Sequence, residues 1–342
     1  MQTLTDRRGR VAGEGIDAGI AAHYGDPLRE QRMMARDVGL VDRSDRGLVV
    51  VTGADRLSWL HSLTTQHLEQ MPDGTTIQGL ILSPHGHVEQ DLWFTALGDE
   101  VWIDCEPGKA AELTDYLDRM RFMLRVEVED RSADFAMISV VGPRAGAVVG
   151  EALGVSAPAA STAVVTSYGV VRALPFEGEL DVLGTPDQIE NAVQRLIEAG
   201  AQPAGQMAYD AWRVEHLRPR AGRETDHRTI PHEIGLIGNA VHLNKGCYRG
   251  QETVARVHNL GRPPRRLVKL QIDGSQHTVP SAGAKVISNN REVGFVGTSV
   301  MHHEEGPVAL AVIKRNIADG AEVLVRDDDV EYAAIVDEGL AV

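Results

Sequence analysis

Cysteine is nearly absent from this chain, and long apolar runs are missing. Only Cys105 and Cys247 occur in 342 residues, which excludes a disulfide framework and a metal centre held by cysteine alone. Such cysteine usage fits a reducing compartment, so we expect a cytoplasmic protein. No run approaches the roughly 18 apolar residues that a membrane span needs, and the first residues lack the apolar segment of a signal peptide. We therefore expect no membrane association and a disordered lead over residues 1–17.

Basic residues are in the minority. The 34 Lys and Arg stand against 49 Asp and Glu, a net charge of −15, which argues against a general nucleic-acid binder. The exception is the stretch 215–269, where eleven Lys and Arg outnumber five acids. An anionic ligand and a merely solvated basic face are both compatible with that stretch.

Cys247 lies inside this basic stretch, in NKGCYRGQETVARVH (residues 244–258). Lys245 and Arg249 flank the thiol, and a helix is predicted to begin near Gly250, with Glu252 in its first turn. Cationic neighbours and a helix N-terminus both lower the pKa of a thiol. The pattern predicts a reactive or ligand-contacting thiol, and the alternative is an inert loop cysteine.

Three predicted strands over residues 78–105 form a second candidate site. A two-residue turn at Gly98-Asp99 would pair Phe94 with Ile103 and Trp93 with Asp104, and strand alternation then separates two faces. We interpret Cys105, on the apolar face, as a buried structural thiol. The opposite face comprises Glu89, Asp91, Trp93, Trp102 and Asp104. These residues are compatible both with a solvated face and with a binding face for a flat heteroaromatic ligand.

Helical periodicity predicts further helices over residues 54–68, 109–122, 185–200 and 205–218. In the third of these, Thr185 is the expected N-cap and Pro186 the first helical residue. Beyond residue 265, short strands over 268–272, 285–287, 293–296, 308–313 and 322–325 predict a small β-barrel or sandwich. No metal site is predicted, because His85-Gly86-His87 lacks a third ligand nearby and His302-His303 is expected to be solvated.

The octapeptide KGCYRGQE (residues 245–252) resembles the signature of the YgfZ family, folate-binding proteins that support iron–sulfur enzymes. VARVHNLGRPPRRLV continues the resemblance. TGADRLSWLHSLTTQHL and WRVEHLRP…IPHEIGL are similar to that family and to its larger relative, the glycine-cleavage T-protein, an aminomethyltransferase. HYGDPLREQRMMARDVGLVDRS and PHGHVEQDLWF are similar to the T-protein. Together these segments cover most of residues 20–315.

The resemblance implies an α+β, T-protein-like folate-binding fold with discontinuous α/β and ferredoxin-like domains and a C-terminal β-barrel. It places a folate-binding α/β domain over residues 18–47 and 134–215. A ferredoxin-like domain that carries the octapeptide would comprise residues 48–133 and 216–265. The barrel would comprise residues 266–342.

The resemblance also implies tetrahydrofolate, or a one-carbon derivative of it, as the cofactor. Glu215 matches the glutamate that T-proteins use on the pterin ring, whose paired donor edge a carboxylate can accept bidentately. Asp91 matches the catalytic aspartate, and Asp104 falls where T-proteins tend to have a pterin-contacting asparagine. The expected catalytic residues are Cys247, Lys245 and Asp91. The expected cofactor contacts are Glu215, Asp91, Asp104, Trp93 and Arg249.

The function that this resemblance implies is a tetrahydrofolate-binding accessory protein for the assembly or repair of iron–sulfur clusters. Its partners would be iron–sulfur client enzymes, tRNA-modifying enzymes among them, or cluster carriers. A single available cysteine cannot store a cluster, which normally needs about four protein ligands. The alternative is a folate-dependent aminomethyltransferase of T-protein type. A tRNA-binding module that uses the basic stretch is a third possibility, which the acidic net charge disfavours.

Overall fold

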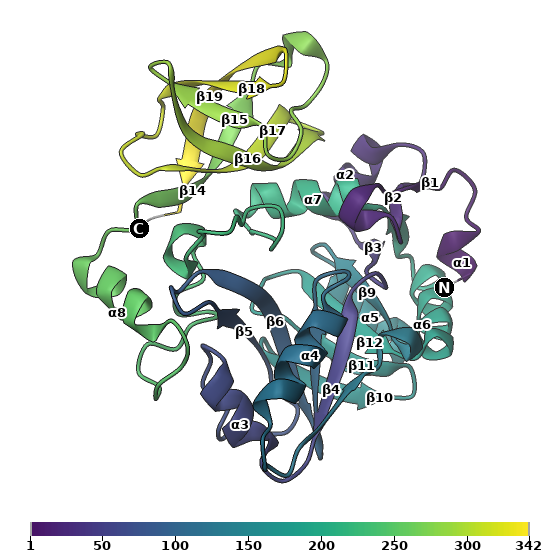
Figure 1. Ribbon diagram of the computed structural model, residues 1–342. Helices are drawn as coiled ribbons and strands as arrows, with labels where there is room; N and C mark the ends of the chain where they lie inside the picture. Colours follow the sequence, from purple (N-terminus) through teal and green to yellow (C-terminus); the bar gives the residue numbers. More distant parts are fainter. Residues whose placement is uncertain (1, 341–342) are drawn as a thin grey trace. The chain divides into compact units, whose positions relative to one another are not determined.

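The computed structural model describes residues 2–340, and the chain divides into two compact units (Figure 1). The first unit comprises residues 1–80 and 90–209, and the second comprises residues 81–89 and 210–342. The turn between the strands β5 (Thr76–Leu82) and β6 (Val88–Leu97) therefore belongs to the second unit. None of the helices within residues 2–340 combines the length and the apolar character that crossing a bilayer demands.

Two β-sheets form the framework of the first unit. The larger has six strands in the order β10-β11-β12-β9-β3-β13, and the smaller has five in the order β5-β6-β7-β4-β8. The strands of the larger sheet are β3 (Gly39–Asp42), β9 (Ala136–Val141), β10 (Thr162–Thr166), β11 (Gly169–Ala173), β12 (Glu179–Gly184) and β13 (Gln202–Ala204). Those of the smaller sheet are β4 (Gly47–Thr52), β5 (Thr76–Leu82), β6 (Val88–Leu97), β7 (Glu100–Cys105) and β8 (Glu127–Asp130).

Helices cover the outer face of each sheet, so the first unit has helix, sheet, sheet and helix layers (Figure 1). α5 (Ala145–Leu153) and α6 (Pro186–Glu198) pack on the six-stranded sheet through an aliphatic core. α4 (Ala110–Met120) packs on the five-stranded sheet and buries Leu113 and Leu117. The inner faces of the two sheets meet through a third set of apolar side chains, Leu48, Val50, Phe135, Met137, Val170 and Leu183.

A local sequence signal explains where α6 begins. α6 starts after Thr185, which is the N-cap that the sequence predicts; its side chain accepts from the backbone N–H of Gln188 in a capping box.

The remaining elements of this unit are α1 (Gln2–Thr5), β1 (Val11–Ala12), η1 (Gly15–Asp17), β2 (Ala21–His23), α2 (Pro27–Arg36), α3 (Arg56–Leu63) and η2 (Ser132–Asp134). α7 (Gln206–Glu215) begins in the first unit and ends in the second.

The expectation of a disordered lead over residues 1–17 is wrong for the part that the structure describes. α1 buries Leu4 completely in the core under α6, and β1 pairs with β2. The backbone N–H of Thr3 also donates to Glu190 at 3.2 Å. A single leucine in a polar segment is too weak a signal for sequence reasoning, and the burial comes from tertiary packing.

A closed six-stranded barrel is the main element of the second unit. Neighbouring strands follow the order β14-β17-β16-β15-β18-β19, and β19 pairs back to β14. Alternate residues of β14, from Val268 to Ile272, point into its apolar core. The strands are β14 (Arg265–Ile272), β15 (Lys285–Ser288), β16 (Arg291–His302), β17 (Gly306–Lys314), β18 (Glu322–Asp327) and β19 (Val330–Gly339). η3 (Pro231–Ile234), α8 (Gln251–Leu260) and η4 (Gly274–Gln276) complete the unit.

The predicted fold class is confirmed: mixed α/β layers are followed by a C-terminal barrel of six strands. Five barrel strands lie where the sequence predicts them, whereas β19 was not predicted. Its sequence, VEYAAIVDEG, does not alternate regularly between charged and apolar residues, and it follows a run of three aspartates that is typical of a solvated loop.

Candidate functional site

The predicted site residues fall into two groups, one in each unit. Asp91 and Trp93 on β6 and Asp104 on β7 lie in the first unit. Glu215, Lys245, Cys247 and Arg249 lie in the second.

The register of β6 and β7 confirms the pairing that the sequence predicts. Trp93 lies opposite Asp104, and Phe94 lies opposite Ile103. The apolar face is fully buried, and Cys105 on it has no exposed surface. Burial raises the pKa of the Cys105 thiol to about 12, so this cysteine is an inert core residue, as predicted.

The opposite face of β6 and β7 is the inner face of the five-stranded sheet. Trp102 packs there in the apolar layer against the six-stranded sheet, and its indole N–H donates to Glu100 at 2.7 Å. Trp102 is therefore a packing residue of this unit, although the sequence grouped it with the candidate binding face. The tertiary neighbour that covers it comes from a distant part of the chain.

Asp104 is held between two buried arginines. Its Oδ2 accepts from Arg46 Nε at 2.9 Å, and its Oδ1 accepts from Arg172 on β11. Arg172 also pairs with Asp181 on β12 at 2.9 Å, so the charged groups form one chain between the sheets. Burial alone would raise the pKa of Asp104, but the charges of Arg172 and Arg46 outweigh it and lower that pKa. Asp104 is thus a permanently ionised partner of two arginines.

Trp93 is largely buried beside the same network. The guanidinium carbon of Arg172 lies 5.9 Å from the centre of the Trp93 ring, and Phe176 contacts it edge-on with ring centres 6.1 Å apart. Both contacts favour one orientation of the indole. The proposed contact between Trp93 and a cofactor remains a prediction.

Asp91 differs from its neighbours because no arginine forms an ion pair with it in residues 2–340. Its Oδ1 accepts a hydrogen bond from Gln78 Nε2 on β5 at 2.8 Å. Burial is the largest influence, and it raises the pKa of Asp91 to about 7 although the bond from Gln78 opposes the shift. The side chain keeps partial exposure. A carboxyl group with these properties can both accept and release a proton near neutral pH.

In the second unit, the cysteine loop leads into α8, as the sequence predicts. The helix begins at Gln251, after Gly250 in the left-handed conformation with φ of +82°. Cys247 is exposed in the turn before it. Gln251 reaches back, and its Nε2 donates to the carbonyl oxygens of Lys245 and Gly246 at 3.4 Å each. The loop is therefore tied to the first turn of its own helix.

The Pro84–His87 turn packs against the same helix start. A Cβ on Gly250 would lie 2.7 Å from the carbonyl oxygen of Ser83 and 2.8 Å from the Cα of Gly86. A Cβ on Gly86 would in turn lie 2.7 Å from the Cβ of Thr253. Two segments that the sequence treats separately thus meet through paired glycines, and this contact supports the backbone next to Cys247.

The two cations that flank Cys247 have different environments. Lys245 is buried, its Nζ lies 5.1 Å from the centre of the Tyr248 ring, and burial lowers its pKa to about 8. Arg249 is exposed and pairs with Glu89 at 3.3 Å. Lys245 is therefore a cation whose charge responds to mildly alkaline pH, whereas Arg249 forms a surface ion pair.

Glu215 ends α7, and its carboxylate is accessible. The side chain keeps 45% of its surface exposed, and Oε2 lies 3.9 Å from Nε2 of His302. Arg213, one half-turn earlier, fixes the helix end because it donates to Asp210 at 2.8 Å and to Thr298 on β16 at 2.7 Å. The backbone at Glu215 is thus held firmly while its carboxylate stays available to a ligand.

The expectation that His302-His303 is solvated is wrong. Both rings are nearly covered, with side-chain exposures of 6% each. Nδ1 of His302 accepts the backbone N–H of Glu305 at 3.2 Å. Burial lowers the pKa of His302, so this imidazole stays neutral at physiological pH.

Sequence reasoning missed the residues that support Asp91 and Asp104. Gln78, Arg46 and Arg172 were not identified as site residues. A signal was present for Arg172, because an arginine inside the apolar strand GVVRA must find a buried partner. The identity of that partner could not be derived from one sequence.

Three further side chains gather near the end of α3, namely His61, His67 and Glu69. Their candidate ligand atoms lie within 4.8 Å of one another. Ligands of one zinc ion lie no more than about 4.4 Å apart, given bonds of about 2.0–2.2 Å. Nδ1 of His61 also accepts the backbone N–H of Leu68 at 3.3 Å. We assign no metal to this cluster.

Two family models cover most of the chain. The model described as the GCVT N-terminal domain matches residues 21–245, and the glycine cleavage T-protein C-terminal barrel domain matches residues 265–339. The chain belongs to the glycine cleavage T-protein family. The second match coincides with the barrel β14–β19, and the first includes Asp91, Asp104, Glu215 and Lys245.

Relatives within the T-protein family are distant but extend over nearly the whole chain. A chloroplastic protein of Arabidopsis thaliana, provisionally named a transferase, is 24% identical over 96% of this chain and 76% of its own length. The aminomethyltransferase of Herpetosiphon aurantiacus is 26% identical over 92% of this chain and 90% of its own. The crystal structure of the glycine cleavage system aminomethyltransferase T from Bartonella henselae has a TM-score of 0.85 and 19% identity. It covers 98% of this chain and 95% of its own, and at this identity it shows the fold alone.

Proposed function

We propose that this T-protein family member binds tetrahydrofolate and supports the assembly or repair of iron–sulfur clusters, as the resemblance to the YgfZ family implies. The observation that carries the proposal is the exposed thiol of Cys247 in a loop braced by Gly250 and Gln251. Its partners would be iron–sulfur client enzymes, tRNA-modifying enzymes among them, or cluster carriers. A cytoplasmic location belongs to the same proposal.

The residues available for the folate fit such a ligand. Glu215 offers an exposed carboxylate at a fixed helix end, which suits the paired donor edge of a pterin. Asp91 offers a carboxyl group that exchanges a proton near pH 7, which suits proton transfer at a folate nitrogen. We assign Glu215 to binding and Asp91 to proton transfer. Contacts from Trp93, Asp104 and Arg249 remain part of the prediction.

The role that we propose for Cys247 rests on two facts. Its thiol is exposed, and the other cysteine of the chain, Cys105, is buried in the core. A cluster that passes from one protein to another can be held by thiolates of both, so one thiolate from this chain is enough. Because Cys247 is exposed in its loop, a partner protein can reach the thiol. Lys245 and Arg249 flank Cys247 in the chain and give the loop positive charge. Because burial lowers the pKa of Lys245 to about 8, part of this positive charge is lost in alkaline solution.

A second candidate function is folate-dependent aminomethyl transfer. The specific observation in its favour is Asp91, because a half-buried carboxyl with a pKa of about 7 is suited to acid–base catalysis. The names of relatives such as the Herpetosiphon aurantiacus aminomethyltransferase point the same way. Asp91→Asn separates the two functions: it abolishes methylene transfer in a transferase and leaves cluster-enzyme activity intact if the accessory role holds.

The decisive experiment is complementation of cells that lack the protein, with an iron–sulfur enzyme activity as the readout. We expect Cys247→Ser to fail while it still folds and binds tetrahydrofolate. Cys105→Ser is the matched control, because it removes the other cysteine from the core; it should lower stability and retain function at permissive temperature. Full activity of Cys247→Ser would refute a role for the thiol.

Tetrahydrofolate binding is tested separately by calorimetry. We expect Glu215→Ala to weaken binding roughly 10-fold or more, since a hydrogen bond to a charged group is worth about 1.5–3 kcal/mol. Glu252→Ala, which removes another acid from the same unit, should bind as the wild type does. Equal affinity of the two variants would remove Glu215 from the site.

A further inference from the structure

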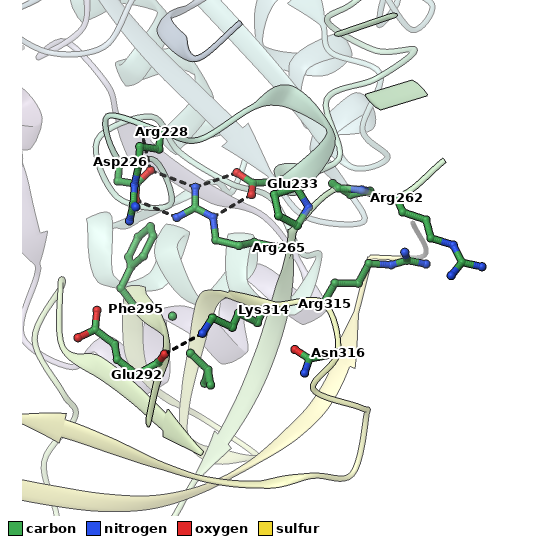
Figure 2. Close-up of a pocket in the computed structure, with 14 residues that line it drawn as sticks. Asp226, Arg228, Glu233, Arg262, Arg265, Glu292, Phe295, Lys314, Arg315 and Asn316 are labelled. Carbon is green, nitrogen blue, oxygen red and sulfur yellow. Dashed lines mark hydrogen bonds and ion pairs between the residues drawn. The ribbon is translucent and has the colours of Figure 1, made fainter. Parts of the chain in front are cut away.

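The second unit contains a basic pocket of about 930 Å³ at one end of the barrel (Figure 2). Its cationic lining consists of Arg228, Arg262, Arg265, Lys314 and Arg315. Three carboxylates also line it, namely those of Asp226, Glu233 and Glu292. The concentration of guanidinium groups is notable in a chain whose net charge is −15.

Each carboxylate of this pocket already forms an ion pair with a basic side chain. Arg265 donates to both oxygens of Glu233 at 2.8 Å and to both oxygens of Asp226 at 2.8 and 3.1 Å (Figure 2). Glu292 forms an ion pair with Lys285 at 3.3 Å. Two carboxylates therefore face the single guanidinium of Arg265, so this cluster keeps one negative charge, and Glu292 is paired with a lysine outside the pocket lining.

The remaining arginines have no carboxylate partner within the described residues 2–340. This holds for the side chains of Arg228, Arg262 and Arg315. In the same part of the chain, Lys314 donates to the backbone carbonyl of Glu292 at 3.3 Å and to no carboxylate, so its charge is not neutralised. Four cations without a carboxylate partner of their own thus line one pocket, together with the amide of Asn316, and the five cations and three carboxylates of the lining leave it a net charge of +2.

The barrel topology explains why these groups gather. β14 and β17 are antiparallel, and Arg265 lies opposite Lys314 in their register. Arg262 precedes the first strand and Arg315 follows the second, so both emerge at the same barrel end, on one side of the pocket in Figure 2. The backbone N–H of Arg315 donates to the carbonyl oxygen of Pro264 at 3.1 Å, which ties the two segments together. The Pro263-Pro264 pair also stiffens the segment that carries Arg262.

We propose that this pocket binds a polyphosphate group, as carried by a nucleoside triphosphate, with Arg262 and Arg315 as its principal contacts. Guanidinium forks match phosphate oxygens bidentately. A chain of phosphates carries several charges within a few ångströms, which suits four cations in one pocket better than a peptide with one charge per residue. Phe295, half-buried in the lining, offers an aromatic surface to a base. Neither Cys247 nor any proposed folate contact is among the residues that line this pocket.

Calorimetry with the full chain tests the proposal, with inorganic tripolyphosphate, ATP and an oligoglutamate peptide as probes. We expect both phosphate probes to bind and the double variant Arg262→Ala/Arg315→Ala to lose at least about 10-fold in affinity. The matched control Arg291→Ala/Arg326→Ala removes the same charge from the barrel surface outside the pocket, and it should stay within about 2-fold of the wild type. Cys247→Ser should bind both probes normally.

The two phosphate probes identify the source of the group. If ATP binds more tightly than tripolyphosphate and Phe295→Leu removes only that advantage, the ligand is a nucleotide. Equal affinities that Phe295→Leu leaves unchanged would identify a phosphate chain alone, and this outcome also supports the site. Three results would overturn the proposal: no phosphate binding, tighter binding of oligoglutamate, or an equal loss in the control variant.

Discussion

Replacing Gly250 by alanine tests whether the cysteine loop depends on the contact between the two glycines. An alanine there must adopt φ of +82°, which costs about 1–2 kcal/mol. Its Cβ would also lie 2.7 Å from the carbonyl oxygen of Ser83 and 2.8 Å from the Cα of Gly86. Both are backbone atoms, so a segment must move, at a further cost of about 1–3 kcal/mol. We expect α8 to lose roughly 2–5 kcal/mol of local stability.

The chain offers a matched control at the other end of the same helix. Gly261 also has a left-handed φ, +67°, but a Cβ there would meet no atom within 4 Å. Gly261→Ala therefore carries the conformational cost of about 1–2 kcal/mol without the clash. The difference between the two variants isolates the close approach to the Pro84–His87 turn.

Hydrogen exchange of peptides that cover residues 244–260, read by mass spectrometry, measures local opening of this segment. Gly250→Ala should lose clearly more protection there than Gly261→Ala. In addition, the alkylation rate of Cys247 should change in Gly250→Ala and not in Gly261→Ala, because only the first variant disturbs the backbone beside the thiol. Equal loss of protection in the two variants would refute the argument.

Two further predictions concern the inner face of the five-stranded sheet. Because burial raises the pKa of Asp91 to about 7, the folded chain keeps a proton that the unfolded chain loses above about pH 4, so stability should fall as the pH rises from about 4 to 7. In thermal unfolding, the free energy of unfolding should be lower at pH 8 than at pH 5 by an Asp91 contribution on the order of 1–3 kcal/mol. Asp91→Asn should remove this difference, and an unchanged difference would contradict the assignment. Arg172→Ala leaves two buried carboxylates without their shared cation and should cost about 3–5 kcal/mol in urea unfolding. The exposed Arg131→Ala, with ion pairs of 3.9 and 4.0 Å, should cost less than about 1 kcal/mol, and similar losses for both would contradict a structural role for the network.

The features that the sequence predicts correctly depend on short-range rules. The cap at Thr185 and the start of α8 follow from side chains within four residues of each helix end. The pairing of Trp93 with Asp104 follows from a two-residue turn and strict alternation. In each case the determining residues are neighbours in the chain, so one sequence contains the whole signal.

The features that were missed depend on partners that are distant in the chain. The first residues are held in place because Leu4 packs in the core under α6. Thr3 also donates to Glu190 on that helix, which is 187 residues away in the chain. The ring of His302 lies 3.9 Å, from Nε2 to Oε2, from Glu215, which belongs to a helix far away in the chain. No local pattern distinguishes these residues from solvated ones.

Asp91 and Asp104 show most clearly why a face can be predicted and a role cannot. Both are aspartates on the inner face of one sheet, and alternation places them there correctly. Arg46 and Arg172 occupy one acceptor site on each oxygen of Asp104 and lower its pKa, so a pterin would have to compete inside a fully buried ion-pair network. Within residues 2–340, Asp91 has Gln78 as its one hydrogen-bond partner; it keeps some contact with solvent, and burial raises its pKa to about 7. The arginines, which the sequence could not pair with either carboxylate, therefore leave Asp91 as the residue that we propose for proton exchange with a ligand.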